Sequence, residues 1–435
     1  MGLLMGKRAS TPASYLTSVV IVVVFSGLLH GNNGSNISFR KKSESQSIVF
    51  PVYGNVYPLG YYSVLMKIGN PPKAYELDID TGSDLTWIQC DAPCRGCTKL
   101  RDQLYKPKNN VVPCADPLCH SIQSHCNQPQ AQCDYSIDYA DQGSSLGVLL
   151  NDIFHLRFAN ESTIPPRLSF GCGYDQQYSG YLPPSATVGV LGLGSGKVSI
   201  NSQLKSLGII DNVVGHCFSG QGGGYLFLGS GDVPTNIKWI PSRIKSSENY
   251  YTLGPADLLF DGNKTDVKNL HLTFDSGSSY SYFNSHAYKL VLNLITSNMN
   301  TKSLRPASED STLPICWKGS RPFESLDKVK GYFKSMAFKF TKGGTAEFHL
   351  NPEDYLVLSK RGSLCLGILN GSEIGLGNTN IVGDIFMQNK MVVYDVERKR
   401  IGWIRSACGD VINAKVCNED RVRIFQYEKC YVKFL

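Results

Sequence analysis

Two short segments of the 435-residue chain resemble each other, and each is an apolar run followed by Asp, a hydroxyl residue, Gly and Ser. The first run, LDID, ends at Asp80, and the second, LTFD, ends at Asp275. Two apolar residues and a glycine follow each copy at a similar distance, ending at Gly192 and Gly383. Because unrelated motifs would not keep the same spacing, the chain is expected to be a duplication with two lobes.

Short strand patterns dominate the rest of the chain, since apolar and polar residues alternate between turn residues. These patterns cover Tyr61–Ile68, Ala74–Ile79, Tyr135–Tyr139, Gly224–Leu228 and Met391–Asp395. Helical periodicity is expected in three segments, Ile200–Leu207, Ser285–Asn298 and Lys328–Ala337. A chain of this length normally divides into more than one core. The expected fold is therefore mainly β with two lobes.

The start of the chain has the layout of a secretory signal, because Lys7 and Arg8 precede an apolar run from Tyr15 to Leu29. We expect a signal peptide over 1–30. The alternative is a signal anchor, although the run is short for a bilayer span of about 20 apolar residues. No later segment is apolar enough for a stable span, so none is expected after signal removal.

The remaining boundaries follow from changes in pattern. A short leader or pro segment is expected over 31–50, too short for a long inhibitory prosegment. The first lobe is expected over 51–235 and the second over 236–408, joined near 231–249, where prolines interrupt the strands. Residues 409–435 form a polar extension to which the sequence assigns no role.

The chain has 14 cysteines, and in the oxidising secretory pathway such cysteines are expected to form disulfides. A cysteine-rich insert spans residues 90–133. The candidates are Cys90, Cys94, Cys97, Cys114, Cys119, Cys126, Cys133, Cys172, Cys217, Cys316 and Cys365. Spacing alone does not give their pairing. Several of these cysteines, with His120 and His125, are also spaced as zinc ligands would be, which is a second interpretation.

Asn-x-Ser/Thr motifs are compatible with glycosylation in the same pathway. The candidate sites are Asn33, Asn36, Asn160, Asn263 and Asn370. The formal net charge of +7 is spread along the chain and forms no basic stripe with interleaved aromatic residues. The sequence therefore does not predict a nucleic-acid partner.

Asp80 and Asp275 each end an apolar strand, so two lobes packed about a pseudo-twofold axis would bring their carboxylates together. Two carboxylates in contact share one proton and titrate as a unit. The ionised member then acts as general base on a water, while the protonated member polarises a peptide carbonyl. This chemistry favours acidic pH and needs no metal, cofactor or covalent intermediate.

The neighbouring residues fit a supporting role on both sides of the axis. Ser83 and Ser278 are expected to bond the outer carboxylate oxygens, and Thr81 and Ser276 to lock the two loops together. Gly82 and Gly277 would permit the close backbone approach that this arrangement requires.

These two loops, with the VLGLG and IVGDIF segments, Trp87, IDYADQGSSLGVL around Tyr139 and the CDAPCRGC insert, resemble the pepsin-like aspartic proteases. The similarity runs from about Phe50 to Cys408 and is strongest to the plant nucellin and nepenthesin branch. It implies a bilobal pepsin-like fold, in which two β-barrel-like lobes are related by a pseudo-twofold axis and enclose an active-site cleft. It also implies catalytic Asp80 and Asp275 and a protein or peptide substrate. The protein is expected to be a monomer of the secretory pathway, located outside the cell, in the cell wall or in the vacuole.

The resemblance implies further roles. Tyr139 would be the tyrosine of a flap hairpin, with its hydroxyl directed toward Trp87. Asp141 stands in the flap where many relatives have a small hydroxyl residue, which alters the contacts made to substrate there. Ser276 replaces a common threonine and preserves its hydroxyl. On this basis a Cys316–Cys365 disulfide is expected. A second disulfide, Cys172–Cys217, is expected to close a loop within the first lobe.

Two rival functions remain. Residues 143–147 match the Gly-x-Ser-x-Gly motif of serine hydrolases, but that nucleophile needs a strand before it and a helix after it, and a hairpin is expected here. The other rival is a catalytically silent binding protein on the same fold, such as the plant inhibitors of microbial xylanases. Retention of both carboxylates, Ser83, Ser278 and Tyr139 favours the enzyme.

Overall fold

The computed structural model describes residues 46–409, except 124–125, 127, 179–186, 243–249, 300–302 and 342–345. These residues all belong to one compact unit, Glu44–Leu435. The expected signal peptide, Asn33, Asn36 and His125 lie outside the described residues, as does the extension beyond Gly409. The first strand begins at Ser47, within the segment expected to be a leader.

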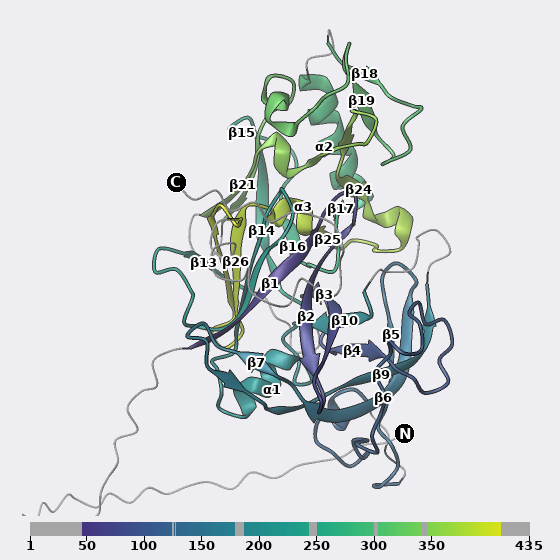
Figure 1. Ribbon diagram of the computed structural model, residues 1–435. Coiled ribbons are helices and arrows are strands. Elements are labelled where there is room, and N and C mark those ends of the chain that lie inside the picture. The colour runs from purple at the N-terminus through teal and green to yellow at the C-terminus, as the bar shows by residue number, and fades with distance from the viewer. Residues whose placement is uncertain are drawn as a thin grey trace, which may run out of the picture. The chain divides into compact units, whose positions relative to one another are not determined.

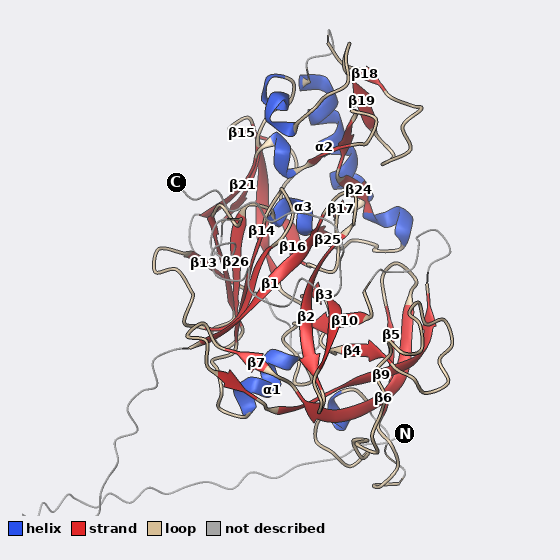
Figure 2. Cartoon of the chain, viewed as in Figure 1, coloured by secondary structure: helices blue, strands red, loops and turns tan. Residues whose placement is uncertain are grey.

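Strands dominate the described residues, and the fold is mainly β as expected (Figure 2). The strands of the largest sheet are β1 (Ser47–Asn55), β2 (Tyr61–Ile68), β3 (Lys73–Asp80), β4 (Trp87–Gln89), β5 (Asp134–Asp138), β6 (Ser144–Ile153), β9 (Arg167–Gln177), β10 (Gly189–Gly192), β11 (Val213–Phe218), β12 (Gly224–Gly229), β13 (Lys238–Pro241), β26 (Lys390–Asp395) and β27 (Arg400–Arg405). Their spatial order is β13-β27-β26-β11-β12-β1-β2-β3-β10-β4-β9-β6-β5.

One end of this sheet combines strands from the two halves of the chain, and we call the six strands β13-β27-β26-β11-β12-β1 the bridging sheet. Here β26, from the end of the chain, pairs antiparallel with β11, and Cys217 lies opposite Met391. β11 pairs in turn with β12, and β12 with β1. Figure 1 shows β26 in yellow-green and β1 in purple, the two ends of the described chain.

A second sheet belongs to the later half of the chain. Its strands are β14 (Thr252–Phe260), β15 (Asn263–Lys264), β16 (Leu270–Phe274), β17 (Ser281–Phe283), β20 (Met336–Phe340), β21 (Ala346–Leu350), β24 (Ile368–Asn370) and β25 (Asn380–Val382). Two small sheets contain β18 (Arg305–Pro306), β19 (Cys316–Lys318), β22 (Leu356–Leu358) and β23 (Leu364–Leu366), and β7 (Leu156–Arg157) with β8 (Thr163–Ile164).

The duplicated motif has the same local structure in both halves. β10 runs parallel to β3, with Gly192 opposite Asp80, and β25 runs parallel to β16, with Val382 opposite Phe274. Each aspartate therefore lies at the end of a strand whose parallel neighbour contains the two apolar residues that precede the glycine in the same half. The pseudo-twofold repeat that the sequence predicted is confirmed by this equivalence.

Helices are few among the described residues. They are α1 (Ile200–Ser206), α2 (Ser285–Asn298) and α3 (Asp384–Met387), with 3-10 turns η1 (Cys119–Ser121), η2 (Leu326–Gly331), η3 (Pro352–Asp354) and η4 (Gly371–Ile374). The first two expected helices are confirmed, and α2 begins after Asn284, whose side chain accepts a hydrogen bond from the Ala287 N–H.

The third expected helix, Lys328–Ala337, is wrong. Its first part forms η2, and from Met336 the chain enters β20, which pairs with β14 on one side and β21 on the other. The helical spacing arises because Val329 and Phe333 are buried by a turn, where Phe333 packs on Trp317. Pairing on both edges of β20 outweighs the local periodicity.

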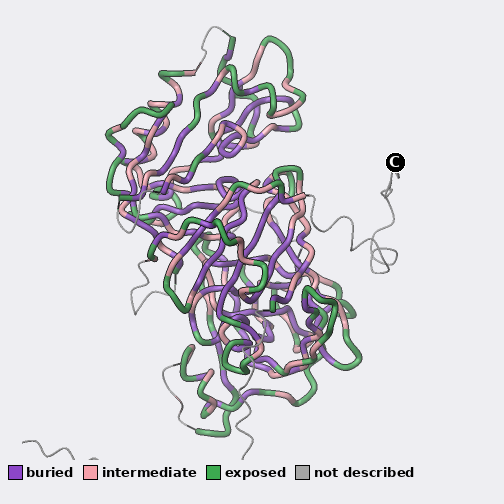
Figure 3. The backbone as a smooth tube through the Cα atoms, turned by 90° about the vertical axis from the view of Figure 1, so that its left-hand side faces the viewer, coloured by how far each residue is buried: buried purple, intermediate pink, exposed green. Residues whose placement is uncertain are grey.

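The core residues lie mainly on the strands. Figure 3 shows that the exposed residues lie mainly along the outer bends of the chain. Leu77 and Ile79 before the first aspartate, and Leu272 and Phe274 before the second, are fully buried. Both aspartates are therefore carried by strands that packing holds in place.

Candidate active site

The structure brings Asp80 and Asp275 together, although they are far apart in the sequence. A Cβ atom added to Gly82 would collide with the Asp275 carboxylate, and one added to Gly277 would collide with that of Asp80. Each glycine thus lies directly against the opposite carboxylate. Any side chain at either position would push the two aspartate loops apart.

The two aspartate loops interlock through reciprocal hydrogen bonds. The Thr81 N–H donates to Ser276 Oγ at 3.1 Å, and the Ser276 N–H donates to Thr81 Oγ1 at 3.0 Å. Each hydroxyl also donates to a carbonyl of the other half, Thr81 to Phe274 at 3.2 Å and Ser276 to Ile79 at 2.8 Å. Both side chains are buried, so these bonds fix the relative position of the loops.

Each carboxylate accepts the same two hydrogen bonds within its own loop. Asp80 accepts from the Ser83 hydroxyl at Oδ2 and from the Gly82 N–H at Oδ1, 2.8 Å away. Asp275 accepts from the Ser278 hydroxyl at 2.8 Å and from the Gly277 N–H at 3.0 Å. The expected supporting residues therefore all lie at the aspartate pair, where they fix the orientation of both carboxylates.

The electrostatics of the pair favour a retained proton. Burial raises the pKa of Asp80 well above its usual range, and the neighbouring Asp275 charge raises it further, while the bonds from Ser83 and Gly82 oppose this shift. The shift belongs to the pair as a unit. At mildly acidic pH a carboxyl group of the pair therefore retains a proton.

The hairpin β5–β6 carries Tyr139 and Asp141 in its turn. The Tyr139 N–H donates to the Gly143 carbonyl at 2.8 Å, and the Asp141 side chain accepts from the Gly143 N–H at 2.8 Å. Trp87 Nε1 donates to the Tyr139 hydroxyl at 2.6 Å, the contact that the resemblance implied. Burial, followed by the Asp80 charge, raises the pKa of Tyr139, so the phenol lies within electrostatic reach of the aspartate pair. Asp141 is exposed.

A third carboxyl group near the pair was missed from the sequence. Asp384, the first residue of α3, is fully buried, and neither of its carboxylate oxygens has a hydrogen-bond partner among the described residues. Burial and the charges of Asp275, Asp78 and Asp80 raise its pKa well above the usual range. The sequence could have pointed to this residue, because Asp384 directly follows Gly383, whereas the apolar Leu193 follows the equivalent glycine of the first half.

Six disulfides occupy the cysteines that the zinc interpretation would have used, so that interpretation is wrong for the described cysteines. The pairs are Cys90–Cys172, Cys94–Cys97, Cys114–Cys126, Cys119–Cys133, Cys217–Cys408 and Cys316–Cys365. Cys316 and Cys365 pair as expected. The expected Cys172–Cys217 bond is wrong, because Cys172 lies opposite Ile88, beside Cys90, whereas Cys217 lies in the bridging sheet near Cys408.

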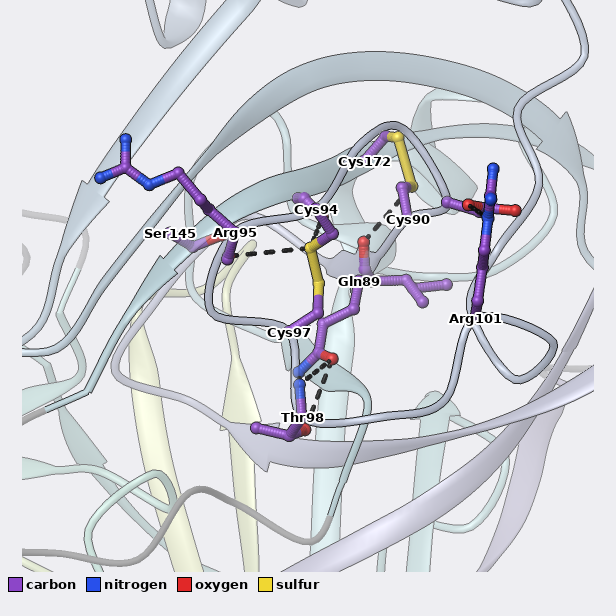
Figure 4. The surroundings of a disulfide bond; sticks show 12 residues. Gln89, Cys90, Cys94, Arg95, Cys97, Thr98, Arg101, Ser145 and Cys172 are labelled. Atoms are coloured by element: carbon purple, nitrogen blue, oxygen red, sulfur yellow. Dashed lines mark hydrogen bonds and ion pairs between the residues drawn. A yellow bond between two sulfur atoms is a disulfide. The ribbon is translucent and has the colours of Figure 1, made fainter.

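The Cys94–Cys97 loop lies beside the Cys90–Cys172 bond (Figure 4). It is held independently of its disulfide, since the Arg95 N–H donates to the Tyr174 carbonyl and the Gln89 side chain accepts from the Thr98 N–H at 2.9 Å. In the other five pairs at least one cysteine is buried, whereas Cys94 and Cys97 are both partly exposed.

The candidate serine nucleophile and the candidate glycosylation sites differ in how exposed they are. Ser145, the serine of the Gly-x-Ser-x-Gly motif, is buried in an antiparallel hairpin with its hydroxyl 3.0 Å from that of Tyr135, so it does not form a nucleophile turn. Asn160 and Asn263 are exposed, while Asn370 is partly buried and its side-chain oxygen accepts a hydrogen bond from the Ser285 hydroxyl.

Within the described residues, no helix has the length and apolar character needed to span a bilayer.

The chain is similar to known proteins along most of its length. Family profiles described as "Xylanase inhibitor N-terminal" and "Xylanase inhibitor C-terminal" match residues 62–230 and 255–404. A relative from Oryza sativa subsp. japonica, named as an aspartic proteinase, is 42% identical over 84% of this chain and 92% of that protein. "Aspartic proteinase 39" of Arabidopsis thaliana is 30% identical, over 85% and 79%.

Solved structures with the same fold include basic 7S globulin from soybean, with a TM-score of 0.66 and 16% identity over 83% of this chain and 95% of that one. Conglutin gamma from lupine seeds has a TM-score of 0.63 and 16% identity over 82% and 95%. Fold, motifs and sequence identity together place the chain in the pepsin-like aspartic protease family of plants.

Proposed function

We propose that the protein is an aspartic endopeptidase that cleaves peptide bonds with a water activated between Asp80 and Asp275. The observation that carries this proposal is the interlocked pair of aspartate loops, in which each carboxylate is oriented by its own serine and glycine. Relatives named aspartic proteinases, at 42% and 30% identity, support a peptidase.

In the proposed reaction, the ionised member of the pair removes a proton from the water as it attacks the peptide carbonyl. The protonated member donates a hydrogen bond to the carbonyl oxygen as negative charge develops there. The hairpin β5–β6 covers the substrate, with Tyr139 anchored by Trp87. Substrate is a protein or peptide, and we propose that the enzyme works as a monomer.

A catalytically silent binding protein is the second candidate, because the matching profiles are described as xylanase inhibitors and the structural neighbours include seed globulins. Purified protein, with its disulfides formed, is expected to cleave acid-unfolded globin at about pH 4, between the ordinary carboxyl pKa and the raised one, and pepstatin is expected to block the cleavage. Failure to cleave at any pH would favour the binding protein.

The pH dependence of this cleavage follows from the carboxyl pair. Activity needs one proton on the pair, so the rate is expected to fall as the pH rises through the raised pKa. This fall can be measured as the initial rate of cleavage of a fluorogenic peptide from strongly acidic to mildly alkaline pH. A rate that keeps increasing above neutral pH would contradict the mechanism.

Replacing Trp87 with Phe is expected to lower kcat/KM about fivefold, because the Tyr139 hydroxyl loses its 2.6 Å hydrogen bond. Tyr139→Phe should have a similar effect, and the double variant little more than either alone. Trp239→Phe is the control, since Trp239 lies in β13 under Arg400. Fully additive losses would show that the two residues act separately.

We also propose that the protein follows the secretory pathway, with glycosylation at Asn160 and Asn263. The six disulfides support an oxidising compartment, and both asparagines are exposed. Expression of the full chain in plant cells, with digestion by an endoglycosidase, tests this. The proposal would be contradicted if the protein were found in the cytosol and its electrophoretic band did not shift after the digestion.

A further inference from the structure

The disulfide between Cys94 and Cys97 takes no part in the mechanism described so far, and it is open to solvent. Both of its cysteines are partly exposed, whereas each of the other five described pairs has at least one buried cysteine. The bond joins residues only 3 positions apart, so closing it stabilises the fold less than closing a long loop does. Exposed disulfides are also the ones that exchange most readily with external thiols. A reductant is therefore expected to open this bond before the others.

The loop that this disulfide closes is bonded to a β-bulge in β9, the strand next to the hairpin β5–β6. Tyr174 is the extra residue of the bulge, because its two neighbours in β9 lie opposite consecutive residues of β6. The Arg95 N–H donates to the Tyr174 carbonyl at 2.8 Å, and the Gln176 N–H donates to the Arg95 carbonyl at 3.0 Å. Arg95 pairs parallel with β9, as β4 does, so the loop holds the bulge from the edge of β9 that faces away from β6.

Gln176 connects this loop to the hairpin. It lies opposite Ser145 of β6, and its side chain is buried with neither amide atom bonded to a partner among the described residues. A Cβ atom added to Gly173 would lie 2.4 Å from the Gln176 amide nitrogen and 3.1 Å from the Ser145 hydroxyl, so these groups are crowded together. Figure 4 shows Ser145 beside Arg95 and the disulfide. Because its side chain is not anchored, Gln176 depends on backbone bonds, one of which comes from the loop.

Opening the disulfide would disturb this support without detaching the loop. Two sulfur atoms that are no longer bonded must move apart to van der Waals distance, which widens the loop. Gly96 already lies so close to β9 that an added Cβ atom would be 2.1 Å from the Gln176 carbonyl oxygen. The loop therefore cannot widen without shifting against the bulge. The bond from the Thr98 N–H to the Gln89 side chain lies outside the disulfide ring, so it persists and keeps the two thiols near each other for reoxidation.

We propose that the Cys94–Cys97 bond is a reversible redox site that controls the hairpin β5–β6. A dithiol opens the bond, the bulge in β9 loosens, and the hairpin becomes more mobile and holds peptide substrate less tightly. The effect on substrate rests on the proposed peptidase function, whereas the reduction of the bond and the loosening of the hairpin do not.

The chemistry is a thiol–disulfide exchange. A thiolate of the dithiol attacks one cysteine sulfur and forms a mixed disulfide, while the other cysteine leaves as a thiolate and takes up a proton. The second thiol of the dithiol then displaces the first cysteine, which also ends as a thiol. The protein gains two electrons and two protons, and the dithiol is oxidised to a disulfide.

The first test identifies the bond that opens. The oxidised full chain is incubated with increasing dithiothreitol at neutral pH, the new thiols are blocked with iodoacetamide, and the labelled peptides are mapped by mass spectrometry. Cys94 and Cys97 are expected to be labelled at a reductant concentration about tenfold lower than the other described pairs require. Cys417 and Cys430 lie outside the described residues, and their peptides are read separately. In the selectively reduced protein, backbone amides of β5 and β6 are expected to exchange hydrogen faster than in the oxidised protein.

The second test measures the effect on substrate. Kinetics are recorded at acidic pH, where thiols are protonated and exchange stops, with rates given per active site titrated by pepstatin. Selective reduction is expected to raise KM for a fluorogenic peptide about fivefold and to leave kcat within about twofold, because substrate must order a more mobile hairpin. Reoxidation with oxidised glutathione should restore KM.

Two double variants separate this bond from the other disulfides. Cys94→Ser with Cys97→Ser should have the raised KM permanently and should not respond to dithiothreitol. Cys114→Ser with Cys126→Ser is the matched control, since it removes another disulfide of the cysteine-rich insert, and it should keep the wild-type response.

The inference fails if another described pair opens first, or if selective reduction changes neither the hydrogen exchange of β5 and β6 nor KM. It also fails if the Cys94→Ser, Cys97→Ser variant still responds to dithiothreitol. Should that variant not fold, the selectively reduced wild-type protein decides. A wild-type protein that cleaves no substrate would refute the proposed function alone, because the labelling and the hydrogen exchange need no cleavage and still test the redox site.

Discussion

Asp80→Asn and Asp275→Asn are each expected to lower kcat by about four orders of magnitude, because an amide neither accepts the proton of the attacking water nor returns it. The isosteric change keeps the size of the side chain and leaves the Ser83 or Ser278 hydroxyl near its present position. Progress curves on a fluorogenic peptide, with circular dichroism to check the fold, measure the effect. More than a few per cent of wild-type activity in either variant would exclude the carboxyl pair as the catalytic group.

The same Asp80→Asn variant is expected to be more stable than the wild type at neutral pH. The folded protein holds the Asp80 proton to a higher pH than the unfolded chain does, because burial and Asp275 raise its pKa. That contribution is complete below the ordinary carboxyl pKa of about 4 and is lost as the pH rises toward the raised value. Asparagine has no such ionisation cost, so thermal unfolding at neutral pH should move upward by several degrees, and the difference should shrink in strong acid.

The control for both measurements is Asp266→Asn, since the Asp266 side chain is 95% exposed. It should change neither the rate nor the pH dependence of stability. An equal stabilisation at neutral pH by this exposed substitution would show that a general charge effect, and not burial at the carboxyl pair, explains the result.

Removing the Cys217–Cys408 disulfide is expected to have the largest effect on stability. The bond joins residues 191 positions apart, and both cysteines are buried in the core beside the bridging sheet. Closure of so long a loop removes much entropy from the unfolded chain, about 5 kcal/mol in the chain-entropy estimate. Alanine at both positions should therefore lower the free energy of unfolding in urea by a similar amount.

The Cys94–Cys97 bond supplies the matched control, because it joins residues only 3 positions apart and its loop is also held by backbone contacts to β9. Its double alanine variant should lose no more than about 2 kcal/mol. Equal losses in the two variants would show that loop closure does not dominate the stability of this fold.

The site was predictable from the sequence where the signal was local and repeated. The strand before Asp80, the turn residues Thr81 to Ser83 and their counterparts after Phe274 are contiguous, so one motif specifies both the strand end and its hydrogen bonds. Helix α2 was equally local, because its capping residue Asn284 and its apolar spacing lie within a single segment.

Features that depend on distant pairing were not accessible in this way. Cys172 and Cys217 were assigned to each other because both lie in the first half, but β9 and β11 belong to different parts of the large sheet. The correct partner of Cys217 is Cys408, which is brought near only when β26 and β27 add to β11. For the same reason, nothing around His216 in the sequence identifies Tyr394, whose hydroxyl lies 3.0 Å from the histidine Nε2, as its neighbour.

The bridging sheet combines early and late strands of the chain, and this has a consequence for protein synthesis on the ribosome. β11 needs β26 on one edge and β12 on the other, and β26 and β27 are the last strands described in the chain. While the chain is still emerging from the ribosome, one edge of β11 therefore stays without its final partner strand. Both aspartate loops precede β26 in the chain, so they are synthesised before the strand that completes this sheet is available.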